Sequence, residues 1–242
     1  MFDILGQHIA SFFLNASDIP PSPEVISDLL RLFQNEGMLP STFQELGPRG
    51  PIPQPRLILQ TANNEWTIQF ASNRFDIAKN PTTNNGSNIG DIATFTNNVT
   101  DYFTRILNHF NRRGTRLSIA THGIMGEMTE LQLESIYRKV IRPISFYDSN
   151  APIEWDLRIC SRITTDSNEP INAITIIKKV RGALIGPTGS VNFNRISIDF
   201  DINTLAENNE TRFTSSSLNS FFTNAIMVRR NILTQIEEMI NA

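Results

Sequence analysis

The stretch RISIDFDI, residues 195–202, sets the fold class because its polar and apolar residues alternate one by one. Successive side chains of a β-strand point to opposite faces of a sheet, so this pattern predicts a strand with one buried and one solvent-facing side. Residues 66–70, WTIQF, and residues 155–160, WDLRIC, alternate in the same way. Strands of this kind are typical of an antiparallel sheet that is covered on one face, within an α+β fold.

Two long amphipathic helices are predicted to cover the apolar face of this sheet. In residues 91–112 and 216–240, large apolar side chains recur at spacings of three and four, which gathers them on one side of a helix. We therefore predict an antiparallel sheet of six or seven strands with these two helices packed on one face. The chain after Asn73 and the chain after Asn194 share an order of strand end, Asn-rich loop and helix, which is compatible with an internal duplication.

Length and composition favour a single domain. The chain has 242 residues, of which 40% are hydrophobic and 19% charged, so it is long enough to bury a large core. Residues 47–55, GPRGPIPQP, contain four prolines and two glycines, which forbid a helix or a central strand. We interpret them as an extended connection within one α+β domain of residues 1–242. It joins an N-terminal strand and helix in 1–46 to the main sheet and helices in 56–242.

Charge and cysteine content exclude several classes of protein. The net charge is −3, so no global positive field attracts nucleic acid or a membrane surface. The single cysteine, Cys160, excludes an internal disulfide framework and a Cys-rich zinc site. The N-terminal segment lacks a basic region ahead of its apolar residues, and no window of about 18 apolar residues occurs, so we expect a cytoplasmic protein.

Few residues in the sequence form a pattern that is typical of a catalytic or metal-binding site. Asp199 and Asp201 form a D-x-D pair on the expected strand, so both carboxylates project from one face and are able to hold a divalent cation. A metal-dependent hydrolase or nuclease is therefore one alternative function. The other interpretation is a charge network, because Arg158 and Arg162 alternate onto the polar face of another strand. The histidines lack metal-ligand spacing, and we expect no catalytic residue and no cofactor.

Two small basic clusters make a nucleic-acid-binding subunit the second alternative. They consist of Arg112, Arg113 and Arg116, and of Lys178, Lys179 and Arg181. Both clusters also have a structural interpretation, because arginines after a helix satisfy its last carbonyl groups. Lysines on an edge strand prevent unwanted strand pairing. With a net charge of −3, nucleic acid is not the favoured partner.

The closing helix carries more apolar residues than one sheet face covers. Phe222, Ile226 and Met227 form the expected interface, because adjacent helical positions point about 100° apart and these three do not all fit one stripe. The helix expected at 22–36 is one candidate to cover them, and a second chain is the other. Because no enzymatic constellation accompanies this surface, the sequence favours a non-enzymatic binding or scaffold protein that contacts itself or another protein.

The order of elements is similar to that of a sporadically distributed bacterial family of proteins of about 250 residues. The resemblance rests on the hairpin PRLILQTANNEWTIQFASNRFDI (55–77), the segment RRGTRLSIATHGI (112–124) and the strand RISIDFDIN (195–203). Arg113, Gly114 and Arg116 match the Arg-Gly start of a family strand, whereas residues 117–122 depart from the Tyr-Ile-Asn-Arg pattern that continues it. The resemblance carries over no catalytic residue and implies an accessory role, such as a component of a bacterial defence system.

Overall fold

The computed structural model describes residues 2–46, 53–165, 168–186 and 189–241. Its strands are β1 (Phe2–Phe13), β2 (Met38–Leu46), β3 (Pro53–Thr61), β4 (Trp66–Ala71), β5 (Arg74–Lys79), β6 (Arg116–Met125), β7 (Asp156–Thr164), β8 (Pro170–Gly186) and β9 (Gly189–Thr204). Its helices are α1 (Pro23–Leu32), α2 (Ile92–His109), α3 (Glu130–Val140), α4 (Ser145–Ser149), the 3-10 turn η1 (Ser215–Ser217) and α5 (Leu218–Asn241).

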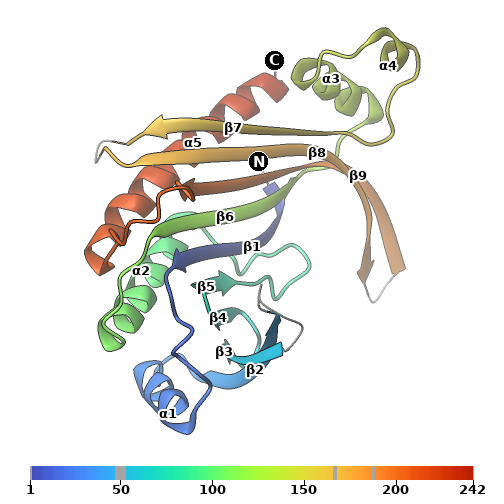
Figure 1. Cartoon of the computed structure of the whole chain (residues 1–242). Coiled ribbons are helices and arrows are strands. Elements are labelled where there is room, and N and C mark those ends of the chain that lie inside the picture. The colour runs from blue at the N-terminus through green and yellow to red at the C-terminus, as the bar shows by residue number, and fades with distance from the viewer. Residues whose placement is uncertain (1, 47–52, 166–167, 187–188, 242) are drawn as a thin grey trace.

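The strands form one antiparallel sheet in the order β2-β3-β4-β5-β1-β6-β9-β8-β7 (Figure 1). Strands β1 and β6 form the central pair, and β5 and β9 flank this pair on either side. The chain leads from β5 into α2 and from β9 into α5. The N-terminal segment therefore contributes β1 to the middle of the same sheet that the rest of the chain builds. None of the described helices has an apolar stretch long enough to cross a membrane.

The expected architecture of six or seven strands and two long helices is wrong. The described part of the chain has nine strands. Among its helices only α5 is long, with 24 residues that continue the three of η1, whereas α2 has 18. The two additional strands are β2 and β5. Residues 47–52 of the Pro/Gly-rich connection lie outside the described residues, as do residues 187–188.

Both additional strands have a local physical reason. Strand β5 pairs back on β4 through a turn of only two residues, since Ala71 lies opposite Arg74. Strand β2 is an edge strand that pairs with β3 over its whole length. Its Pro40 removes a backbone donor, which an edge strand tolerates and a central strand does not.

The core lies between the sheet and the helices α2 and α5, on one face of the sheet (Figure 1). Phe95 and Phe103 of α2 are fully buried, and Phe200 of β9 is 2% exposed. The expected alternation of residues 155–160 does not hold as a core pattern. Trp155 precedes β7 and packs on Tyr137 of α3, with ring centroids 5.9 Å apart. Ile159 is 48% exposed, because it faces an open groove between the edge strand β7 and α5.

Candidate functional site

The sheet face opposite α2 and α5, which we call the open face, carries a hollow of about 450 Å³. A row of paired residues crosses its floor: Ile174 of β8 lies opposite Asp201 of β9, Asp201 lies opposite Ala120 of β6, and Ala120 lies opposite Ile9 of β1. Ile176, two positions from Ile174, also lines the hollow. The alternation that buries Phe200 sends Asp199 and Asp201 to this face, as the sequence predicts.

A charged cluster forms one side of this open-face hollow. Lys178 Nζ donates to Asp199 Oδ2 at 2.8 Å, and His122 Nδ1 shares a hydrogen bond with Asp199 Oδ1. The three side chains come from the adjacent strands β8, β9 and β6, so the sheet register brings them together. Burial works to raise the pKa of Asp199, but the hydrogen bonds from His122 and Lys178 outweigh it and hold this pKa below its ordinary value.

This geometry does not favour a metal site at the two aspartates. Both carboxylate oxygens of Asp199 already bind cationic or polar groups, and the Lys178 ammonium would repel a divalent cation. Asp201 accepts a hydrogen bond from Asn203 at 3.0 Å. The described residues contain no group of three His, Cys, Asp or Glu side chains placed to hold a metal ion. The charge network expected with Arg162 also differs, because Arg162 pairs with Glu207 at 2.7 Å.

The structure does not bring the two basic clusters together. Arg116 lies at the start of β6, whereas Lys178 is opposite Ser197, whose other neighbour is Ile124 near the end of β6. Several members are also neutralised by ion pairs: Arg112 with Asp18 at 2.5 Å, Lys178 with Asp199 at 2.8 Å, and Lys179 with Glu130 at 3.0 Å. This arrangement lacks the continuous positive stripe that phosphate backbones require.

The three residues of the expected helix interface have different environments. Phe222 is 2% exposed and lines the seam between α5 and α2, so it belongs to the core. Ile226 is partly exposed, and Met227 is 49% exposed. Helix α1 packs on α2, where Phe33 and Tyr102 have ring centroids 5.4 Å apart. It is therefore α2 that covers Phe222.

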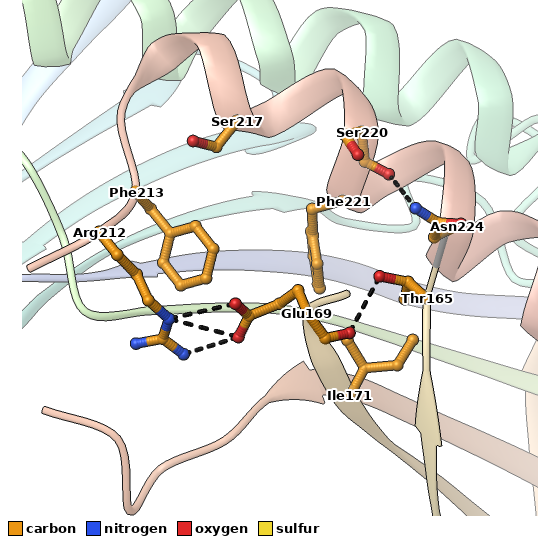
Figure 2. Close-up of a pocket in the computed structure, with 9 residues that line it drawn as sticks. All are labelled: Thr165, Glu169, Ile171, Arg212, Phe213, Ser217, Ser220, Phe221 and Asn224. Atoms are coloured by element: carbon orange, nitrogen blue, oxygen red, sulfur yellow. Dashed lines mark hydrogen bonds and ion pairs between the residues drawn. The ribbon is translucent and has the colours of Figure 1, made fainter. Parts of the chain in front are cut away.

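A second hollow, of about 260 Å³, lies at the start of α5 (Figure 2). Glu169 binds Arg212 through two oxygens, at 2.8 Å from Nη2 and 3.3 Å from Nε. The Thr165 hydroxyl donates to the Glu169 carbonyl at 2.9 Å, and Asn224 donates to the Ser220 carbonyl at 2.9 Å. Figure 2 shows that the ion pair between Arg212 and Glu169 links the chain that enters α5 to the residue that precedes β8.

A partly buried polar cluster between the helices α2 and α5 and the central strands has no counterpart in the sequence analysis. Arg229 of α5 donates through Nε to the Thr121 hydroxyl at 2.9 Å and lies over the Phe200 ring, 5.1 Å from its centroid. Burial lowers the pKa of the Arg229 guanidinium. His8 of β1 is 2% exposed, and its ring meets that of Phe95 edge-on at 5.5 Å. Burial is the main cause that lowers the pKa of His8 to about 4, with Arg229 adding to it.

Comparison with family models, curated proteins and solved structures finds no match to this chain. The class of this protein therefore follows from its fold and from the open-face hollow alone. They define a two-layer α+β protein whose helices cover one face of a nine-stranded sheet. The other face presents apolar and charged side chains to solvent.

Proposed function

We propose that this chain is a non-enzymatic binding protein that holds a partner protein on the open face of its sheet. The observation that carries the proposal is the apolar floor of the open-face hollow, formed by Ile9, Ala120, Ile174 and Ile176. The solvent-facing side of an antiparallel sheet is normally polar. A contiguous apolar patch with charged residues at its rim is typical of a protein–protein interface.

The charges at the rim define the chemistry of the partner. His122 and Lys178 lie on either side of Asp199, and Asp201 lies further along the same strand. A partner surface therefore has to place an apolar side chain in the hollow and polar groups around it. Large anchoring side chains in such hollows supply most of the binding energy of an interface, while surrounding charges select the partner.

The experiment is quantitative affinity capture from cells that express the chain, comparing the native protein with Ile174→Asp. We expect the substitution to abolish capture of the partner, because it places an unpaired carboxylate on the apolar floor. Leu131→Asp is the matched control, since Leu131 is 79% exposed on α3, away from this floor. Far-UV circular dichroism checks that both variants fold.

Identical capture by the native chain and Ile174→Asp would contradict the proposal. The identity of the captured protein also tests the biological role that the family resemblance implies. Participation in a bacterial defence system remains a prediction, and its support is the resemblance of the segments 55–77, 112–124 and 195–203.

A further inference from the structure

We propose that the edge strand β7 pairs antiparallel with β7 of a second copy of this chain about a two-fold axis. The two sheets then become one continuous sheet with the helices of both copies on the same side. This inference concerns a different surface from the open-face hollow and does not depend on the proposed function. It rests on the exposure of β7, on the groove beside it, and on the charges along the strand.

Strand β7 has the features of an edge that is built to be paired. Seven of its nine residues are exposed, and all nine pair with β8 in one uninterrupted register. Every second residue of an edge strand turns its N–H and C=O groups outward, where they form a template for another strand. Its sequence, DLRICSRIT, contains no proline, no lysine and no bulge among the paired positions. The opposite edge, β2, carries Pro40, which guards against such pairing.

An apolar groove follows β7 on the helix side of the sheet. It has a volume of about 340 Å³ and lies between the strand and α5. Ile159 and Ile163 line it from β7, and Ile232 and Ile236 line it from α5. A second β7 placed beside the first puts its own Leu157 and Ile159 at the open side of this groove. Pairing therefore removes apolar surface from water as well as satisfying backbone groups.

The two-fold axis restricts the possible registers. Because the axis is perpendicular to the sheet, odd-numbered residues face the helix side in both copies, so each residue pairs with one of the same parity. A register centred on Ile159 places Asp156 opposite Arg162 of the second copy, and symmetry repeats this pair. Opposite charges facing each other across two strands stabilise the pairing.

The neighbouring registers lack this complementarity. Centring on Cys160 places Arg158 opposite Arg162 of the second copy, twice, and like charges in that position are destabilising. Centring on Ser161 leaves Asp156 unpaired and forms no opposite-charge pair. Among the registers that pair seven or more residues of β7, the one centred on Ile159 is therefore the one with charge complementarity, and it is the register that we propose.

Cysteine cross-linking tests the register. In the variant Ile159→Cys/Cys160→Ser the two introduced thiols lie directly opposite each other, within reach of a disulfide. In the native chain the two Cys160 side chains lie on a diagonal, about 7–8 Å apart, which is too far. We expect mild oxidation to give a dimer, of twice the 27.3 kDa chain mass, in the variant and not in the native chain. Preferential cross-linking of the native chain would overturn this register.

Charge reversal tests the dimer without any covalent bond. By sedimentation velocity, we expect Asp156→Arg and Arg162→Asp each to weaken dimerisation at least about tenfold, and the combined variant to restore it. Rescue by the combined variant separates pairing across the axis from loss of the contact between Arg162 and Glu207 within the chain. A monomeric native chain at micromolar concentration would overturn the proposal. We expect Ile174→Asp to remain dimeric, because Ile174 belongs to β8 and not to the edge strand, so failure of either proposal is distinguishable from failure of the other.

Discussion

Acid is expected to destabilise this protein through one buried side chain, His8. Its pKa in the folded protein is about 4, against 6.5 for an exposed histidine. As the pH falls below 6.5 the unfolded chain takes up a proton that folded His8 does not, so the free energy of unfolding decreases. A pKa difference of one unit corresponds to about 1.4 kcal/mol. The free energy of unfolding therefore decreases by about 2 kcal/mol between pH 7.5 and pH 5. The full loss of about 3 kcal/mol is reached only below pH 4.

Urea denaturation at pH 7.5, 6 and 5 measures this loss directly, for the native chain and for His8→Gln. Glutamine fills similar space without titrating, so the difference between the two pH dependences isolates His8 from every other titrating group. We expect the native chain to lose about 2 kcal/mol more than His8→Gln over this range. Equal losses in the two proteins would refute the reasoning, because they would show that His8 is protonated equally readily in the folded and unfolded states.

Three further predictions concern stability and are read from denaturant melts. Phe103→Ala removes a fully buried ring of α2 and is expected to cost about 3–5 kcal/mol; a loss under about 1 kcal/mol would contradict the placement of α2. Gly86→Ala places a Cβ 1.8 Å from the Leu5 carbonyl oxygen, whereas Gly90→Ala, at a similar positive φ, meets nothing within 4 Å. We expect about 1 kcal/mol for Gly90→Ala and at least twice that for Gly86→Ala, and equal costs would argue against this approach to β1. Arg56→Met deprives the carbonyls of Ala16 and Phe70 of a buried donor and is expected to cost about 2–4 kcal/mol, while an unchanged midpoint would show that water replaces the guanidinium.

Period-two alternation predicted the strands whose apolar side chains meet the core, and it missed the strands that depend on other features. Residues 66–70 and 195–202 form β4 and part of β9, because Ile68, Phe70 and Ile198 each need a buried face. Alternation does not predict β5 as a separate strand, since the reversal over Ser72 and Asn73 contains no Gly or Pro. Strand β2 was missed because an exposed edge strand has no buried face to impose a pattern.

For the candidate site, the sequence predicts which side of the strand its aspartates occupy, but not which residues they contact. Alternation alone places Asp199 and Asp201 on one side of β9. Their partners depend on register, and His122 lies 77 residues from Asp199 in the sequence. The burial of His8 and the partial burial of Arg229 are also not predictable from the sequence. The ring of Phe95 in α2 packs against His8, and Arg229 of α5 lies over Phe200 of β9, so contacts between distant segments withdraw these two side chains from solvent.

The central position of β1 has a consequence for how this molecule is made. Phe12 pairs with Phe75 on one side and with Leu117 on the other, so β1 has to find partners far along the chain. Such non-local pairing gives a high contact order and slow folding, on the order of milliseconds to seconds. During synthesis at about 5–20 residues per second, β6 follows β1 out of the ribosome by roughly 5–20 s. During that interval the side of β1 that pairs with β6 has no native neighbour. The strands β6, β9, β8 and β7 are added to the sheet only afterwards, with β1 as their starting edge.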